Sequence, residues 1–188
     1  MSEYNLPDFS SVGIVQRPAV VLSTPTRPFV LPEEAEEARA LTERLMRAAE
    51  NVRQLYLSPK GLGIAAPQLG VDRRMAILWP ADGEAICLLN ATVVGYSDDS
   101  DVRFEGCLSF FDVRVRVRRR RSVTIHGHTL TGETVEERYV DGLARLALHE
   151  LDHLDGVLLT DRMEEPGDCI SYQEYRQRTD TAWTYHSR

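Results

Sequence analysis

Residues 143–156 read LARLALHELDHLDG, and this stretch predicts the helix around which the rest of the chain is organised. Leucines recur at helical spacing, no proline interrupts the run, and Gly156 stands where a helix commonly ends. His149 and His153 are four residues apart, so both imidazoles lie on one helical face and can bind the same metal ion. Glu150 is then placed to take a proton from water that the metal activates. The alternative is a core helix with two hydrogen-bonded histidines.

A third metal ligand must come from elsewhere, because two protein ligands seldom hold a metal ion. Cys107 is the strongest candidate, since it follows a glycine in the segment FEGCLSF at 104–110 and thiolate is a strong ligand for zinc and iron. The competing candidates are His126, His128 and His186. Two of these, His126 and His128, would share one face of a strand, where a surface position is the commoner outcome.

The composition is that of an ordinary globular domain. The 188 residues are 43% hydrophobic and 27% charged, which suits one domain with its own core. The formal net charge of −7 argues against binding of nucleic acid by the whole surface, and we expect no specific nucleic-acid partner. The three cysteines do not form a disulfide framework, which favours a reducing compartment. We see no signal peptide and no apolar run of membrane-spanning length, so we expect a cytoplasmic protein without a membrane partner.

Three parts are expected along the chain. Residues 1–18 form an extended, proline-containing N-terminal arm, residues 19–165 form the domain that carries the motifs, and residues 166–188 form a polar tail that is either a short helix or loose. A short strand is expected at Ala19–Leu22. Between Pro32 and about Tyr56, apolar residues fall on one stripe and predict a long amphipathic helix.

Strands account for most of the remaining chain. Residues 74–79 and 85–94 read as two strands, and Cys87 inside the second is expected to be buried. Residues 112–118 alternate as DVRVRVR, which predicts a strand with valines facing inward and arginines outward. A further strand begins at residue 122, and residues 128–140 form a hairpin that turns at Leu130-Thr131-Gly132.

These elements predict an α+β fold, in which antiparallel strands pack around the H-E-x-x-H helix and the long N-terminal amphipathic helix lies outside. The basic run from Arg114 to Arg121 has two interpretations. It either contacts RNA or an acidic partner, or it forms a solvated sheet face that acidic loops balance.

The segment GLGIAAPQ at 61–68 is the last unusual stretch. Its two glycines and small residues let backbone approach a neighbour closely, but the third glycine and following helix of a nucleotide-binding loop are missing. Gln68 could donate its side-chain amide to a ligand oxygen. A tight turn entering a strand is the alternative.

Three motifs now stand in order, GLGIAAPQ at 61–68, EGCLS at 105–109 and HELDH at 149–153, and together they closely resemble the peptide deformylases. The similarity spans about residues 19–163. Members of that family remove the formyl group from N-formylmethionine on nascent chains. The resemblance implies a metal-dependent hydrolase that releases formate from N-formylmethionyl peptides, with the ribosome as a candidate partner.

The resemblance also implies roles for individual residues. One divalent metal ion, most commonly Fe(II) in this family and otherwise Zn or Ni, would be bound by Cys107, His149 and His153. The catalytic residues would be Glu150 as proton carrier, and Gln68 with the backbone N–H of Leu108 as the pair that stabilises the oxyanion. The substrate-binding residues would be Gly63, Leu62, Arg114 and Leu146.

Two positions depart from the family pattern. Leu148 precedes the first histidine where glutamine is usual, and Phe110-Phe111 follow EGCLS where a proline is common. Neither departure touches the metal or Glu150, so the departures concern the substrate and not the reaction. Two alternatives therefore stay open: the same chemistry on another N-formylated or N-acylated small molecule, or a catalytically silent binding relative. A zinc endopeptidase is disfavoured by the cysteine ligand and by the lack of a third histidine or glutamate downstream.

Overall fold

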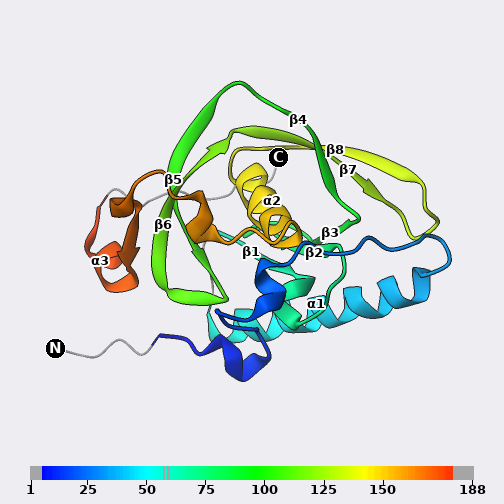
Figure 1. Ribbon diagram of the computed structural model, residues 1–188, viewed down its shortest axis with the longest axis horizontal. Helices are drawn as coiled ribbons and strands as arrows, with labels where there is room; N and C mark the ends of the chain where they lie inside the picture. Colours follow the sequence, from blue (N-terminus) through cyan, green and yellow to red (C-terminus); the bar gives the residue numbers. More distant parts are fainter. Residues whose placement is uncertain (1–5, 57, 59, 180–188) are drawn as a thin grey trace.

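The computed structural model describes residues 6–56, 58 and 60–179. Within them, the strands form three antiparallel sheets of three strands each (Figure 1). The first sheet is β1 (Leu62–Ala65), β2 (Met75–Trp79) and β3 (Ile86–Leu89). The second has the order β4 (Thr92–Tyr96), β7 (Ser122–His128) and β8 (Thr134–Val140). The third has the order β5 (Ser100–Cys107), β6 (Phe110–Arg120) and β9 (Cys169–Ser171).

Helix α2 (Asp141–Leu154) lies at the centre of these sheets and carries the H-E-x-x-H segment. It packs against β1 and β2 on one side and against β6, β7 and β8 on the other. Gly156 follows the helix with a φ of 70°, the left-handed conformation that glycine adopts easily, and a Cβ there would lie 2.7 Å from the carbonyl carbon of Thr24. The predicted central helix and its glycine stop are therefore confirmed.

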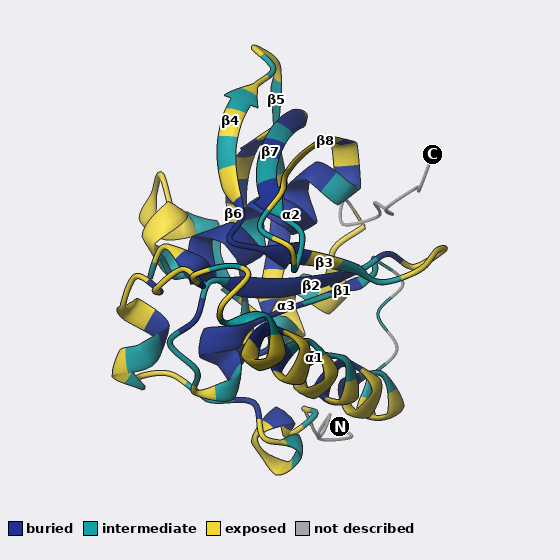
Figure 2. Ribbon diagram, turned by 90° about the vertical axis from the view of Figure 1, so that its right-hand side faces the viewer, coloured by how far each residue is buried: buried dark blue, intermediate teal, exposed yellow. Residues whose placement is uncertain are grey.

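Helix α1 (Ala35–Leu55) covers the first sheet from outside, as the amphipathic stripe predicts. Its buried face is made of small and aliphatic residues, and its other face is exposed to solvent (Figure 2). The buried positions are Ala38, Leu41, Leu45, Ala48, Ala49 and Val52. Leu55, which the stripe placed inside, is 47% exposed at the end of the helix. These layers confirm the predicted α+β fold, and none of the described helices is long and apolar enough to cross a bilayer.

Three local predictions were wrong. The segment Ala19–Leu22 is not a strand: a 3₁₀ helix spans Val20–Ser23, because Leu22 N–H donates to the Ala19 carbonyl at 3.1 Å and closes a local turn. The strand expected over 85–94 is broken at Asn90, whose φ is 52°. The Asn90 side chain exchanges two hydrogen bonds with the backbone of Phe29, at 2.7 and 2.9 Å, and this long-range contact separates β3 from β4. Cys87 is exposed, not buried.

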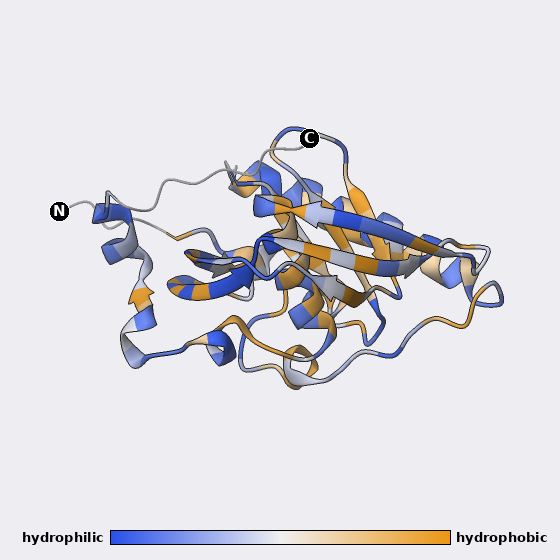
Figure 3. Cartoon of the chain, turned by 90° about the horizontal axis from the view of Figure 1, so that it is seen from above, coloured by the Kyte–Doolittle hydropathy of each residue, from blue (hydrophilic) through white to orange (hydrophobic). Residues whose placement is uncertain are grey.

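The alternation in β6 holds for most of its length (Figure 3 shows hydrophobic and hydrophilic bands along the strands) but fails at Arg114. Val115 and Val117 are buried as predicted. Arg114 is also buried, with 6% of its surface exposed, although it was expected to face outward. Arg119 lies on the same face as Val115 and Val117 and is 5% exposed. The reason is tertiary: each side chain reaches a polar or aromatic site that other elements build.

The exposed arginines of the basic run lie beside acidic groups. Arg118 pairs with Glu164 at 2.9 Å, and Arg121 pairs with Asp141 at 2.5 Å. Arg120 donates to the backbone carbonyl of Asp98 at 2.6 Å. This arrangement favours the solvated sheet face balanced by acidic loops over a surface for RNA.

The chain after residue 162 returns to the third sheet. Strand β9 pairs with β6, with Val115 opposite Cys169 and Val113 opposite Ser171. The short helix α3 (Tyr172–Gln177) follows, with the Ser171 hydroxyl accepting a hydrogen bond from Glu174 N–H at its start. The tail prediction of a short helix therefore agrees with residues 172–177, while residues 1–5 of the arm and 180–188 of the tail lie outside the described residues. The proposed limits of arm, domain and tail stay predictions.

Candidate active site and metal centre

Three side chains from two elements, β5 and α2, come together in one cluster. Cys107 is the last residue of β5, and His149 and His153 lie one helical turn apart on α2. Their ligand atoms all lie within 4.8 Å of one another, and Cys107 Sγ is 3.3 Å from His153 Nε2. The structure thus brings together the three ligands predicted from the sequence, and among the described residues it contains no other such group of histidine, cysteine and acidic side chains.

The donor set fits a divalent metal ion. Bond lengths of about 2.0–2.3 Å to zinc or iron place tetrahedral donors less than about 4 Å apart, which small side-chain rotations achieve here. Burial acts to raise the pKa of the Cys107 thiol, but the adjacent rings of His153 and His149 lower it to about 5, so the thiolate form that binds metals is favoured. His153 Nδ1 is buried without a hydrogen-bond partner among the described residues.

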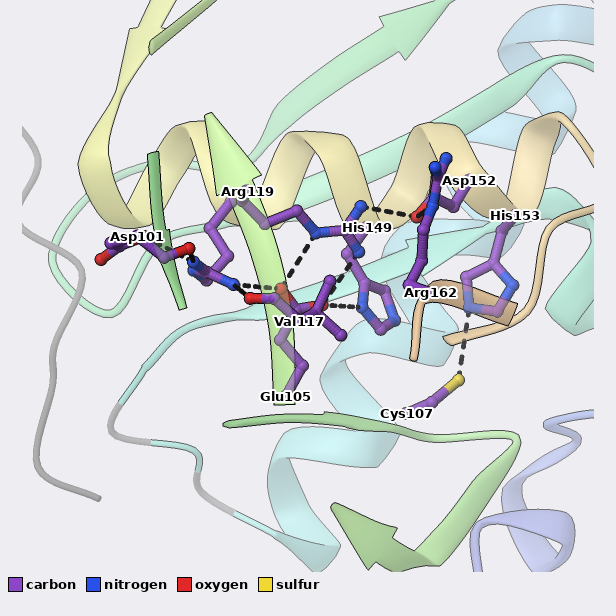
Figure 4. Close-up of polar contacts among 10 residues, drawn as sticks. Asp101, Glu105, Cys107, Val117, Arg119, His149, Asp152, His153 and Arg162 are labelled. Carbon is purple, nitrogen blue, oxygen red and sulfur yellow. Dashed lines mark hydrogen bonds and ion pairs between the residues drawn. The ribbon is translucent and has the colours of Figure 1, made fainter. Parts of the chain in front are cut away.

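A carboxylate fixes the first histidine from behind. His149 Nδ1 lies 3.0 Å from Glu105 Oε2, which leaves the other ring nitrogen directed toward the cluster. Glu105 is itself held by Arg119, at 3.0 Å to each carboxylate oxygen, and by Arg145 at 2.6 Å (Figure 4). Burial acts to raise the pKa of Glu105, but these cations and the His149 bond hold the pKa well below its usual range. Glu105 therefore stays anionic and orients the imidazole.

The same network extends along α2 to the residue before the second histidine. Asp152, next to His153 on α2, accepts hydrogen bonds from Arg119 at 2.6 Å and from Arg162 at 2.5 Å (Figure 4). Arg119 thus joins Glu105 on β5 to Asp152 on α2. Because every charge in this buried network has an opposite charge beside it, the cost of burial is offset and the ligands are held in one geometry.

Glu150, also on α2, lines a cavity into which the ligand cluster opens. It is 2% exposed, and its Oε2 has no hydrogen-bond partner among the described residues. Burial raises the pKa of Glu150 to about 7, against the opposing effect of His149 and His153, and a bound cation would act in the same direction as those rings. Gly63 on β1 leaves room for this carboxylate, since a Cβ there would lie 2.0 Å from Glu150 Oε1.

Gln68 is oriented by two contacts at the end of the GLGIAAPQ segment. Its Oε1 accepts a hydrogen bond from Ala65 N–H at 3.0 Å, so its Nε2 faces Ser109 Oγ at 3.3 Å and Cys107 Sγ at 3.7 Å. In this segment the strand β1 comes first and the turn, a 3₁₀ helix over Ala66–Leu69, follows it. The side-chain amide of Gln68 therefore lies beside Cys107, close to where a ligand oxygen would be bound in the functional interpretation of this segment.

The cluster opens into a cavity of about 240 Å³. Next to Glu150, the cavity wall includes Leu62, Leu108 and Leu146, an apolar surface suited to an aliphatic side chain. Arg114 lines the cavity as well. All the predicted ligand and substrate-contact positions except His153 and Gln68 therefore line this one cavity, and those two contact Cys107.

Two of the competing histidines, His126 and His128, are not part of the cluster. His126 and His128 are half-buried on β7, and His126 pairs with Glu136 at 2.7 Å. His186 lies outside the described residues.

Several site residues were not found from the sequence. Glu105 stands inside the EGCLS motif, two residues before the cysteine ligand, and this proximity was the only available signal. Arg119 was hidden in a run of similar arginines. Tyr172 and Tyr175 of α3 line the cavity although they lie in the predicted tail.

Comparison with known proteins decides the family. The family model described as "Polypeptide deformylase" matches residues 12–168. The chain belongs to this family. A peptide deformylase from Desulforudis audaxviator is 36% identical over 133 residues, which cover 71% of this chain and 86% of that protein.

Solved deformylase structures match the fold. The class I type b peptide deformylase from Acinetobacter baumannii superimposes with a TM-score of 0.72 at 28% identity, covering 80% of this chain and 97% of that one. The peptide deformylase from Thermotoga maritima gives a TM-score of 0.69 at 29% identity, covering 81% and 97% of the two chains. These matches confirm the predicted family and its class of enzyme, a metal-dependent peptide deformylase.

Proposed function

We propose that this chain hydrolyses the N-formyl amide of N-formylmethionyl peptides, with Cys107, His149 and His153 as metal ligands and Glu150 as proton carrier. The observation that carries the proposal is the combination of three ligand atoms within 4.8 Å of one another and a buried carboxylate, Glu150, in the cavity that Cys107 and His149 also line. A divalent metal ion bound there would act as a Lewis acid and would lower the pKa of water.

The chain's own residues supply the remaining chemistry. Glu150 accepts a proton from the attacking water and passes it to the leaving nitrogen, so that the C–N bond breaks to give formate and a free amine. The Gln68 amide and the backbone N–H of Leu108 donate hydrogen bonds to the oxygen on which negative charge develops. Burial of the Gln68 side chain, which is 1% exposed, strengthens this interaction because water does not compete with it.

The substrate backbone has a natural partner in β1. This strand lies at the edge of its sheet, with β2 on one side and its other edge free of strands among the described residues. Gly63 on this edge lies against the Glu150 carboxylate and lines the cavity. An extended peptide can therefore pair with Gly63 and place its first side chain against Leu62 and Leu146.

For the metal, we propose Fe(II), with Zn or Ni able to replace it, because one thiolate and two imidazoles suit all three ions. We further propose that the enzyme acts on nascent chains in the cytoplasm, beside the ribosome. The family membership supports this setting.

The test is a formate-release assay with formyl-Met-Ala on enzyme loaded in turn with Fe(II), Zn or Ni. We expect turnover with the wild-type chain and a loss of about 10²- to 10⁴-fold in Glu150→Ala, the usual contribution of a general acid–base group. Elemental analysis should find the metal retained in this variant. Glu136→Ala, which removes an exposed glutamate of β8, is the matched control and should behave as wild type. Substantial turnover by Glu150→Ala would reject the role of Glu150, and release of acetate but not formate from N-acyl substrates would favour an amidase of different specificity.

A further inference from the structure

Residues 14–17 of the N-terminal arm lie against both segments that carry the proposed oxyanion donors. Val15 N–H donates to the Gln68 carbonyl at 2.8 Å, and Arg17 N–H donates to the Ser109 carbonyl at 3.0 Å. These two bonds join the 3₁₀ helix that contains Gln68 to the turn between β5 and β6. A short stretch of the arm therefore connects two parts of the site that are far apart in the chain.

Between these two backbone bonds, the side chain of Gln16 also reaches the turn. Its Nε2 donates to the Leu108 carbonyl at 3.2 Å and to the Ile14 carbonyl at 3.0 Å. Both neighbours are carbonyl oxygens, which only accept hydrogen bonds, so the NH₂ end of the amide must face them and both of its hydrogens are used. Gln16 thus fixes the plane of the peptide group that joins Leu108 to Ser109.

The other side of this peptide group is fixed by the metal ligands. Ser109 N–H lies 3.4 Å from Cys107 Sγ and donates to it, so one chain of hydrogen bonds runs from Gln16 through the peptide to the sulfur. Hydrogen bonds in such a chain polarise and strengthen one another. The proposed oxyanion donor, Leu108 N–H, is separated from this peptide by a single Cα. Because only two torsions are soft at each residue, the direction of that N–H depends on how the peptide is held.

The second oxyanion donor depends on the same turn. Gln68 Nε2 donates to Ser109 Oγ at 3.3 Å, and both residues are only 1% exposed. A movement of the Leu108–Ser109 peptide therefore displaces a partner of the Gln68 amide together with Leu108 N–H. The side chain of Gln16, which does not line the active-site cavity, supports both donors.

The arm does not need the Gln16 amide for its attachment. Phe9 and Ile14 are each 2% exposed and belong to the same hydrophobic cluster as the buried face of α1. The backbone bonds of Val15 and Arg17 do not involve the Gln16 side chain either. Gln16 is half-buried, so its amide can bond to water when it leaves the turn. Its contact with the Leu108 carbonyl is therefore explained by the orientation of the turn and not by anchoring of the arm.

We propose that Gln16 is a positioning residue for the oxyanion donors and acts through the Leu108–Ser109 peptide. The proposal rests on the function proposed above and adds a residue that lies outside the three sequence motifs. Gln16 holds Leu108 N–H and the Gln68 amide where negative charge develops on the formyl oxygen. Since that charge exists only during the reaction, Gln16 lowers the barrier of the chemical step and leaves ground-state binding of the peptide almost unchanged.

The first test is formate release from formyl-Met-Ala by Gln16→Met, which keeps an unbranched side chain of similar size and removes the donor. We expect kcat per bound metal ion to fall about 10-fold and KM to stay within about 2-fold of wild type, a smaller loss than removal of an oxyanion donor causes. Gln16→Lys places a donor on an unbranched chain again and should recover most of the rate. Gln54→Met, at an exposed position of α1, is the matched control and should behave as wild type.

A purely structural role predicts a different result. If Gln16 only stabilised the arm, Gln16→Met would lower the melting temperature or the metal content, and kcat per bound metal ion would equal that of wild type. That result would overturn the proposal, and so would a Gln16→Lys variant that is no more active than Gln16→Met. Gln16→Glu is the second variant in case Gln16→Met does not fold: it keeps a polar side chain of the same length but turns an acceptor toward two carbonyls, so it should show the same loss of kcat.

Nuclear magnetic resonance separates this proposal from the proposed function, because it needs no turnover. In ¹⁵N-labelled enzyme loaded with diamagnetic zinc, Gln16→Met should shift the backbone amide resonances of Leu108 and Ser109 and the side-chain amide resonances of Gln68. Gln54→Met should leave all of them unchanged. If the wild-type chain released no formate, the proposed function would fail, and these shifts would still support the positioning by Gln16. Formate release by wild type with unshifted resonances in Gln16→Met would overturn the positioning role alone.

Discussion

The two ends of the active-site cavity are built on different principles. At the metal end, His149, Glu105 and Arg119 form a continuous chain of buried, oppositely charged contacts of 3.0 Å. At the other end, Arg114 and Lys60 lie against aromatic rings and phenol hydroxyls. The buried ionic contacts allow one arrangement only, whereas rings tolerate sideways displacement of a cation. From this difference we expect the metal ligands to be held more rigidly than the residues around Arg114 and Lys60.

The largest effect should come from the metal end, in Cys107→Ser. Because a hydroxyl is a much poorer metal ligand than a thiolate, we expect loss of bound metal and a fall in activity of more than about 100-fold, beyond the range of an outer-shell change. Elemental analysis and formate release measure both. Cys87→Ser, on the exposed cysteine of β3, is the matched control and should keep metal and rate. Full metal and full rate in Cys107→Ser would remove the sulfur from the ligand set.

Gly63→Ala tests how closely Glu150 is held. The new Cβ would lie 2.0 Å from Glu150 Oε1, so the carboxylate must move. A displacement of this size costs about 100-fold in kcat, and we expect the metal content to remain unchanged. Gly95→Ala in β4 is the control, since its Cβ would meet Thr124 only at 3.7 Å. An unchanged kcat in Gly63→Ala would mean that the position of Glu150 is not critical.

Glu105→Gln tests the support behind the ligand. The change removes the anion that orients His149 and leaves Arg119 and Arg145 without their shared partner. We expect metal affinity to fall about 10- to 100-fold, measured by competition with a chelator. Urea unfolding of the metal-free protein should report a loss of about 3–5 kcal/mol in the free energy of unfolding.

The matched control is Glu164→Gln, which breaks an exposed pair with Arg118 and should alter neither quantity measurably. If Glu105→Gln changed stability but not metal affinity, the network would support the fold and not the ligand.

The smallest effect should come from the far end, in Tyr172→Leu. Loss of one ring beside the Arg114 guanidinium removes a cation–π contact, which predicts a fall of about 3- to 10-fold in kcat/KM, mainly through KM. Steady-state kinetics with a formylated dipeptide measures it, and Tyr96→Leu at an exposed site of β4 is the control. A collapse of kcat instead would show that the far end also controls the chemistry, and the contrast between the two ends would no longer hold.

The sequence was informative wherever the decisive contact was local. The spacing of His149 and His153 placed two ligands on one helical face, and the apolar stripe at 38–52 predicted the buried face of α1. It was misleading where a distant group intervened. Asn90 interrupts an apolar run because it forms hydrogen bonds with the backbone of Phe29. Arg114 breaks the alternation of β6 because the Tyr172 ring of α3 lies 4.5 Å from its guanidinium.

By itself, the sequence determined the family of this protein and the candidate catalytic groups, since three short motifs carry the sulfur, the two imidazoles, the carboxylate and the amide that the proposed reaction uses. Only the tertiary structure decided how these groups are supported and what surrounds the substrate. Arg119 and Arg145 bind Glu105, and the pairing of β9 with β6 brings Tyr172 and Tyr175 to the cavity. Both contacts join residues that are far apart in the chain. Side-chain periodicity reports the face of an element, and it carries no information on which distant element will pack against that face.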